Sequence, residues 1–249
     1  MIERSVSDGI VTLRLAHGKA SALDLELLDA LALALAGAAT DAASKALILT
    51  GTGSIFSAGV DLFRLVDGGR AYAERFYRSL TASLLELFAF PKPLVVATNG
   101  HAIAGGCIMT LAGDYRLMSA GNGRIGMPEL LVGVPFPPSV LEAVRFAVPP
   151  QHLQALIYTG RTVLPDEALR LGLIDEVATD VLPRAEEVAR QLAALPEEGF
   201  RMAKRQLRDR TISRAKHYAH EFDADTVELW ASEGTHARVR EYLAKTVRK

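Results

Sequence analysis

Residues 94–98 read LVVAT, residues 99–109 read NGHAIAGGCIM, and residues 126–129 close the stretch with GMPE. The apolar, β-branched run at 94–98 is typical of a buried strand. Gly105 and Gly106 then remove side chains just before a segment of small, helix-competent residues. A glycine loop that opens a helix exposes backbone N–H groups at the positive end of the helix dipole. Such a loop can stabilise a negatively charged oxygen atom.

Glu129 is the only acidic residue between Asp114 and Glu142, and it follows a proline inside an apolar segment. A carboxylate in such surroundings can have a raised pKa and act as a base near neutral pH. The more common fate of a lone glutamate is to cap a helix or to pair with a cation. The residues alone leave these two interpretations open.

A second strand followed by a glycine loop lies earlier in the chain. Residues 45–50 read KALILT and predict a strand, and residues 54–61, SIFSAGVD, predict an irregular segment. The intervening Gly51-Thr52-Gly53 does not favour a dinucleotide-binding loop, because Phe56 stands where the third glycine belongs. The chain therefore contains two units in which a strand is followed by a glycine loop.

Composition excludes several classes of function. The chain has 249 residues, a formal net charge of −1 and one cysteine, so a basic field for nucleic acid, an intramolecular disulfide and a cysteine-based metal cluster are not expected. The six histidines show no metal-ligand spacing. No secretory signal and no apolar run of membrane-spanning length is visible, so no membrane partner is expected and the cytoplasm is the expected compartment.

The order of predicted elements indicates an α/β fold in which residues 1–195 form a core and residues 196–249 a C-terminal helical region. A hairpin turning at Asp8-Gly9 is predicted first, followed by a helix capped by Asp24. Further elements are predicted as helices at 71–90, 181–195 and from Glu197 to the end, and as strands at 114–118 and 173–177.

The chain resembles the crotonase family, also called the enoyl-CoA hydratase/isomerase family. The resemblance rests on LILTG (47–51) before FSAGVD (56–61), on LVVATNG (94–100) before AGG (104–106), and on Pro128-Glu129. It continues through TGR (159–161) to ALRLGLIDEV (168–177). These motifs span nearly the whole chain, and they occur in the family's order.

The resemblance implies a crotonase-like spiral of repeated β-β-α units, with C-terminal helices that cover a site or dock on a neighbouring subunit. Phe222, Leu229, Trp230 and Tyr242 would supply the apolar contacts of those helices. Family members usually assemble as trimers, often paired into hexamers. They act on acyl-CoA thioesters, so coenzyme A is part of the substrate, and neither a separate cofactor nor a metal is expected.

By position, the resemblance implies that the thioester oxygen binds between the backbone N–H groups of Val60 and Gly105. Both lie in the glycine loops described above. The neighbouring positions of the substrate pocket are then Ala58, Gly59, Gly106 and Ile108.

Ile108 is the departure from the family pattern. Typical hydratases carry a glutamate there, three residues after the oxyanion glycine, and use it with the glutamate at position 129 to hold and activate water. Isoleucine cannot do this, whereas moving a double bond needs only one base. A site with Glu129 alone therefore resembles a Δ3,Δ2-enoyl-CoA isomerase.

Other functions stay open on the sequence. A hydratase could recruit an acid from elsewhere, such as Asp67, Glu74 or Lys92, if the fold brings it to the pocket. A thioester hydrolase, a decarboxylase and a non-catalytic acyl-CoA-binding or assembly protein are further alternatives.

The remaining polar residues are expected to serve structure. Asp61 should cap the helix after the first loop, Asp114 should pair with Arg116, and Cys107 should lie in the core. The basic stretch of the C-terminal region should be a solvated helix face or a subunit contact, with CoA phosphates as a weaker alternative. It comprises Arg201, Lys204, Arg205, Arg208, Arg210 and Arg214.

Overall fold

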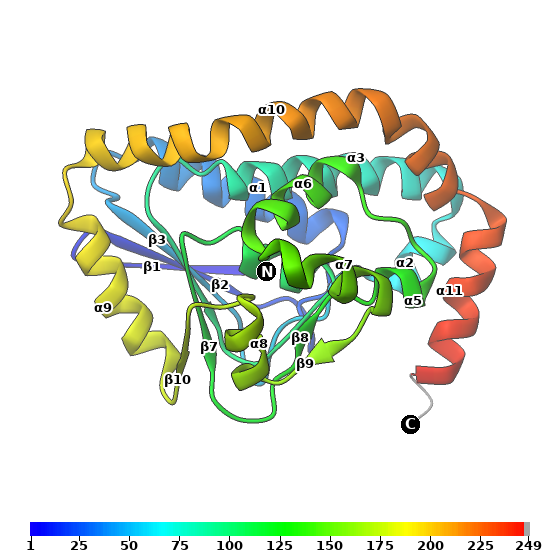
Figure 1. The fold of residues 1–249 in the computed structure, drawn as a ribbon, viewed down its shortest axis with the longest axis horizontal. Helices are drawn as coiled ribbons and strands as arrows, with labels where there is room; N and C mark the ends of the chain where they lie inside the picture. Colours follow the sequence, from blue (N-terminus) through cyan, green and yellow to red (C-terminus); the bar gives the residue numbers. More distant parts are fainter. Residues whose placement is uncertain (247–249) are drawn as a thin grey trace.

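The computed structural model describes residues 1–246 and contains two sheets (Figure 1). The larger sheet pairs its first two strands as an antiparallel hairpin, and its other neighbours run parallel. The order of its strands is β1 (Ile2–Ser7), β2 (Ile10–Leu15), β3 (Ala46–Thr50), β5 (Leu94–Thr98), β7 (Tyr115–Ser119) and β10 (Glu176–Ala178).

The smaller sheet consists of strands of two or three residues. Its order is β4 (Ile55–Ser57), β6 (His101–Ile103), β8 (Ile125–Gly126) and β9 (Thr162–Val163). Because β3, β5 and β7 are each followed by one of these short strands and then a helix, the chain winds through repeated β-β-α units. The predicted crotonase-like spiral is confirmed. The segment expected to be wholly irregular, 54–61, contains β4, since three residues are too few to carry a periodic signal.

The helices cover the large sheet on both faces. Helix α9 packs on one face, and α1, α3 and α10 form layers on the other. Their bounds are α1 (Leu25–Thr40), α2 (Leu62–Asp67), α3 (Gly69–Phe88), α4 (Gly105–Leu111), α5 (Glu129–Val132), α6 (Pro138–Ala147), α7 (Pro150–Thr159), α8 (Pro165–Leu171), α9 (Val181–Ala193), α10 (Glu197–Trp230) and α11 (Glu233–Thr246).

The side chains expected to cap helices do so. Asp24 accepts a hydrogen bond from the Leu27 N–H at 2.8 Å, and Asp61 accepts one from the Arg64 N–H at 3.0 Å. The strand predicted at 173–177 begins later, at Glu176. Leu173 and Ile174 are buried without belonging to a strand, which explains why their apolar character suggested one.

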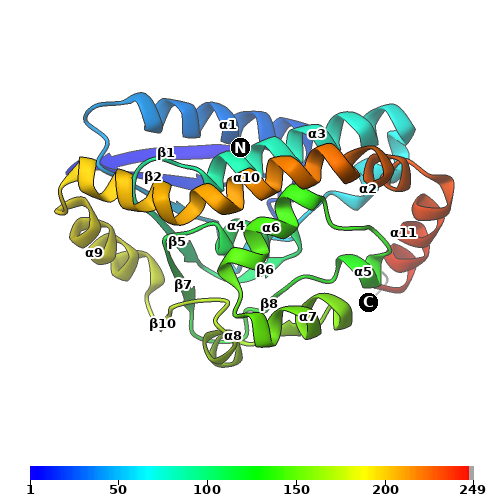
Figure 2. The same ribbon diagram turned by 45° about the horizontal axis from the view of Figure 1, so that its top comes forward.

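The C-terminal helices fold back on the chain's own core. Figure 2 shows α10 lying across α3 and α6, and α11 turning toward α2 and α5. Trp230 is buried, whereas Phe222 and Leu229 remain 44% and 52% exposed, so only part of the predicted apolar set makes full contact within the chain. The last three residues of the predicted region 196–249 lie outside the described residues.

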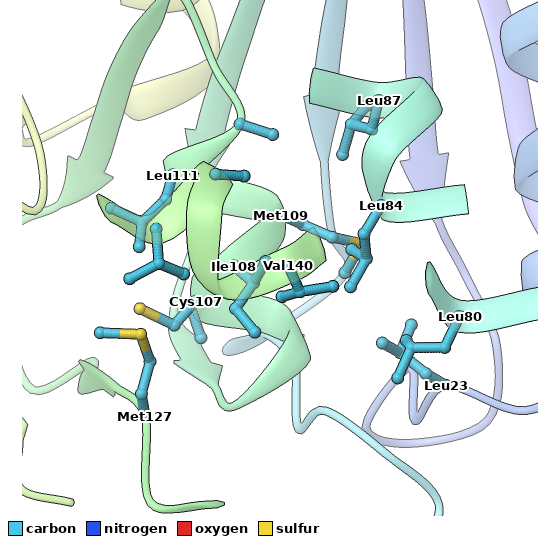
Figure 3. Packing of buried hydrophobic residues seen from close by; sticks show 14 of the residues in the cluster. Leu23, Leu80, Leu84, Leu87, Cys107, Ile108, Met109, Leu111, Met127 and Val140 are labelled. Carbon is cyan, nitrogen blue, oxygen red and sulfur yellow. The ribbon is translucent and has the colours of Figure 1, made fainter. Parts of the chain in front are cut away.

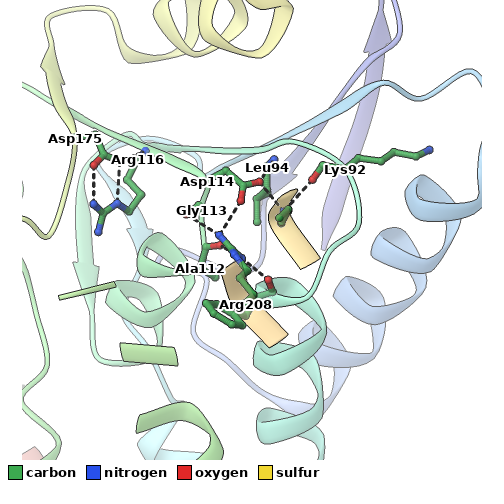
Figure 4. A network of polar contacts seen from close by, with 10 residues as sticks. Lys92, Leu94, Ala112, Gly113, Asp114, Arg116, Asp175 and Arg208 are labelled. Carbon is green, nitrogen blue, oxygen red and sulfur yellow. Dashed lines mark hydrogen bonds and ion pairs between the residues drawn. The ribbon is translucent and has the colours of Figure 1, made fainter. Parts of the chain in front are cut away.

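The predicted ion pair between Asp114 and Arg116 is wrong. Asp114 Oδ2 accepts from Lys204 at 2.6 Å and its Oδ1 from Arg208 at 2.8 Å, both from α10 (Figure 4). Arg116 instead forms a two-pronged pair with Asp175. Asp114 directly precedes β7, and the long cationic side chains of α10 reach its carboxylate from a segment about 90 residues later in the chain.

The basic stretch of α10 is thus a solvated face only in part. Lys204 and Arg208 are 7% and 5% exposed, and Arg208 also donates to the carbonyl groups of Phe88 and Ala112. Burial lowers the pKa of Lys204 to about 8, against the opposing effect of Asp114. The four other basic residues, Arg201, Arg205, Arg210 and Arg214, are exposed as expected.

Candidate active site

An apolar cavity of about 100 Å³ lies between the two glycine loops, helices α3 to α6 and the C-terminal helices. Its lining residues are Ala58, Val60, Leu62, Leu80, Leu84, Ile103, Ala104, Gly105, Ile108, Pro128, Glu129, Val132, Val134, Pro137, Val140, Trp230 and Tyr242. Five of the seven positions predicted from the sequence line it together: Ala58, Val60, Gly105, Ile108 and Glu129.

The first loop directs the Val60 N–H away from the backbone that supports it. Leu23 donates its N–H to Gly59 O at 2.8 Å and accepts from the Asp61 N–H at 2.9 Å, which makes a parallel bridge centred on Val60. In such a bridge the central residue's own N–H points to the opposite side. Since Val60 lines the cavity, its N–H is available to an atom bound there.

The second loop presents Gly105 as the first residue of α4, where a helix N–H has no partner within the helix. Ala104 before it has φ 50° and ψ −120°, a conformation that costs a residue other than glycine on the order of 1–3 kcal/mol. The Ala104 N–H donates to Gly126 O at 2.8 Å, and its carbonyl accepts from Ile108 at 3.0 Å. These contacts fix the turn that presents the Gly105 N–H.

Gly59 and Gly106, which were predicted as pocket residues, lie behind the cavity. A Cβ at Gly59 would stand 2.7 Å from Ile103 O and 3.1 Å from the Gly105 nitrogen. A Cβ at Gly106 would stand 2.4 Å from Ser57 O. Both glycines therefore allow the two loops to approach each other closely.

Glu129 begins α5 and is 6% exposed. Its Oε2 atom has no hydrogen-bond partner within the described residues. Burial raises the pKa of Glu129 to about 8, and only its own backbone N–H opposes that rise. Among the described residues that line the cavity, it is the only one with a carboxylate. A carboxyl with this pKa can both accept and return a proton near neutral pH.

Ile108 of α4 lines the same cavity and is 6% exposed. Figure 3 shows it beside Val140, on the side of the core that faces Leu80 and Leu84 of α3. Among the described residues, the side chains around Ile108 in this part of the cavity are apolar.

The acids and bases considered as replacements for a second glutamate do not line the cavity. Asp67 and Glu74 are absent from its walls. Lys92 is buried elsewhere and donates to the carbonyl groups of Ala38 and Asp41 at 2.9 and 2.7 Å, so it caps the end of α1.

Cys107 is fully buried, as expected for a core residue, and burial raises the pKa of its thiol. Within residues 1–246, no group of three or more His, Cys, Asp or Glu side chains is arranged to hold a metal ion. No helix in that range has the length and apolar character needed to span a bilayer.

Sequence reasoning missed several walls of the cavity. Leu80 and Leu84 come from α3, Val140 from α6, and Trp230 and Tyr242 from the C-terminal helices. Trp230 and Tyr242 stand out as aromatic residues in a highly charged region. Their presence indicates that the region packs against something, but it does not indicate that they contact the site.

Two sheets wound from repeated β-β-α units, with C-terminal helices folded over them, are the crotonase fold of α/β proteins. The family model for enoyl-CoA hydratase/isomerase matches residues 5–245, and the chain belongs to that family, whose members act on acyl-CoA thioesters.

Relatives with different names match the chain at similar levels. It is 28% identical to the mitochondrial enoyl-CoA delta isomerase 1 of Rattus norvegicus, over 85% of this chain and 74% of that protein. It is 32% identical to the carnitinyl-CoA dehydratase of Salmonella arizonae, over 84% of this chain and 82% of that protein. The human mitochondrial delta3-delta2-enoyl-CoA isomerase structure, 23% identical, superposes with a TM-score of 0.92 and covers 99% and 98% of the two chains.

Proposed function

We propose that this protein is an enoyl-CoA isomerase that converts a 3-enoyl-CoA to the 2-enoyl-CoA, with Glu129 as the single proton shuttle. The observation that carries the proposal is the composition of the cavity lining. The lining includes one carboxylate, Glu129, and it has an isoleucine at position 108, where a second glutamate would be needed for hydration.

In this mechanism the thioester oxygen accepts hydrogen bonds from the N–H groups of Val60 and Gly105. The Glu129 carboxylate removes a proton from C2, and the electrons of that C–H bond move toward the thioester oxygen to give a dienolate. The two N–H groups stabilise the negative charge. The protonated Glu129 then delivers the same proton to C4, the double bond shifts to C2–C3, and the carboxylate is regenerated.

Ile108 favours this reaction over hydration for two reasons. Adding water across a double bond requires a held water molecule and a second proton-transfer group. The apolar wall at Ile108 provides neither, and it also keeps bulk water from exchanging with the proton on Glu129.

A dehydratase or hydratase is the second candidate, because the Salmonella arizonae relative carries a dehydratase name at 32% identity. The two candidates differ in the substrate they turn over. We expect rapid conversion of 3-enoyl-CoA to 2-enoyl-CoA and slow hydration of 2-enoyl-CoA by the same preparation. Fast hydration would reject the isomerase assignment.

Glu129→Gln tests the assigned base. The amide keeps the shape of the side chain and cannot accept the proton, so isomerisation should fall by several orders of magnitude while binding of saturated acyl-CoA persists. Glu142→Gln, which changes a buried carboxylate outside the cavity lining, is the matched control. Equal rates for the parent and Glu129→Gln would remove Glu129 from this role.

A further inference from the structure

The walls of the cavity differ in their access to solvent. Val60, Leu62 and Tyr242 are partly exposed. Other lining side chains are buried: Leu80 is 3% exposed, and Val140 and Trp230 are each 2% exposed. A chain that enters beside the partly exposed residues can therefore reach the buried part of the lining, which comes from α3, α6 and the end of α10.

Trp230 is the largest side chain of that wall, and its position is fixed from three sides. Its ring stacks on Phe76 at a centroid distance of 6.2 Å and meets Tyr77 edge-on at 5.8 Å. Its indole Nε1–H donates to Pro135 O at 2.9 Å. A hydrogen-bonded ring packed between two other rings cannot turn aside for a ligand without breaking these contacts.

The segment that carries Trp230 is itself fastened to α3. Tyr77 donates its hydroxyl to Asp223 at 2.6 Å, and Arg70 forms a two-pronged ion pair with Glu228 at 2.7 Å. Glu228 and Asp223 lie two and seven residues before Trp230 on α10, within about two helical turns. These contacts join the end of α10 to α3 on either side of the cavity lining.

We infer that Trp230 is a specificity-determining residue: it closes the inner end of the acyl pocket and sets the longest acyl chain that binds fully. The inference rests on the acyl-CoA substrate class of the proposed function, but it does not depend on which reaction follows. Chains up to that length bury each added methylene group against apolar walls, and longer chains do not.

The test measures dissociation constants of saturated acyl-CoA esters of increasing chain length by titration calorimetry. Each methylene group that enters the pocket should strengthen binding about fourfold, until affinity stops rising at a limiting length. Trp230→Ala should move that limit to chains at least two carbons longer. Trp230→Leu, which retains an apolar side chain and is gentler on the fold, should move it in the same direction by less.

Leu229→Ala is the matched control, because Leu229 precedes Trp230, is 52% exposed and does not line the cavity. Its limiting length should equal that of the parent. If folded Trp230→Ala or, should that variant not fold, Trp230→Leu keeps the parent's limit, the inference is overturned. Saturated esters undergo no isomerisation, so a failed isomerase assay combined with a shifted limit would reject the proposed reaction and leave the role of Trp230 intact.

Discussion

At the scale of single residues, the behaviour of the site depends on what surrounds one carboxyl group. Glu129 is buried among apolar side chains and has no cation beside it within the described residues. A carboxylate in that setting is costly to ionise, because water no longer solvates the charge. The same burial that makes Glu129 a poor acid makes it a stronger base.

This burial predicts how the rate of isomerisation depends on pH. The active form is the carboxylate, and the pKa of the free enzyme's Glu129 is raised to about 8. Because protonation removes the base, kcat/KM should fall about tenfold for each pH unit below that value and level off above it. Initial rates measured from acidic to alkaline pH, with circular dichroism to confirm folding, check this. A flat profile would contradict a base buried in this way.

Position 108 offers a second prediction about a single residue. Ile108→Glu places a carboxylate in the cavity that Glu129 already lines, so that the pair can hold and activate water. We expect this variant to hydrate 2-enoyl-CoA measurably, and the parent to do so far more slowly. Ile108→Leu, which stays apolar, is the control. The explanation of the isomerase preference fails if Ile108→Glu folds, binds acyl-CoA and shows no hydration.

At the scale of elements, the site depends on the close packing of the two glycine loops, the second of which leads into the first residue of α4. The Leu23 bridge supports the first loop, and Gly59 lets it contact the turn before α4. The strained turn at Ala104 then orients the N–H group of Gly105, the first residue of α4. Because the backbones of the two loops lie so close together, only small residues fit between them.

Gly105→Pro tests the start of α4. Proline is accepted at the first position of a helix, but it has no N–H to donate and it disturbs the turn at Ala104. Losing one such donor costs about 3 kcal/mol of transition-state stabilisation, which is roughly a hundredfold or more in kcat. Gly105→Ala keeps the N–H, although its Cβ needs Leu23 Cδ1 to move from 2.6 Å. An unchanged rate in folded Gly105→Pro would contradict the assigned donor.

The docking of α10 gives a prediction about stability. Asp114→Ala leaves two buried cations, Lys204 and Arg208, without their counter-charge. Removing one partner from a buried ion pair typically costs about 3–5 kcal/mol. Urea unfolding of the variant should show a loss of that order. Glu198→Ala, which removes an exposed ion pair with Arg201, should change stability by less than about 1 kcal/mol. Similar losses in both variants would contradict the structural role of Asp114.

At the scale of the whole molecule, the C-terminal region completes the chain's own cavity. Trp230 and Tyr242 line it, so the site does not need those residues from a neighbouring subunit. The surface keeps other large apolar side chains exposed, among them Leu131, Tyr158 and Leu207 at 59%, 67% and 70%.

We propose that copies of the chain associate as trimers or hexamers through parts of this exposed apolar surface, as the family resemblance implies. Light scattering coupled to gel filtration should give a mass three or six times that of one chain. A single-chain mass at micromolar concentration would exclude such an assembly. Because Trp230 is buried within its own chain, Trp230→Leu should leave the assembled mass unchanged.

The sequence by itself determined most elements and the family. Apolar strands such as 94–98, the capping aspartates Asp24 and Asp61, and the glycine loops are local signals, so neighbouring residues suffice to reveal them. The resemblance that these motifs carry, in their order, predicts the spiral and the site residues Val60, Gly105, Ile108 and Glu129.

Only the tertiary structure decided what lies opposite those residues. Leu80 and Trp230 are 49 and 101 residues away from Glu129 in the sequence, and no local pattern links them to it. The partner of Asp114 was misjudged for the same reason: Arg116 is its neighbour in sequence, but Lys204 and Arg208 reach it across the fold. Burial, and with it the raised pKa of Glu129, is likewise a property of contacts between distant segments.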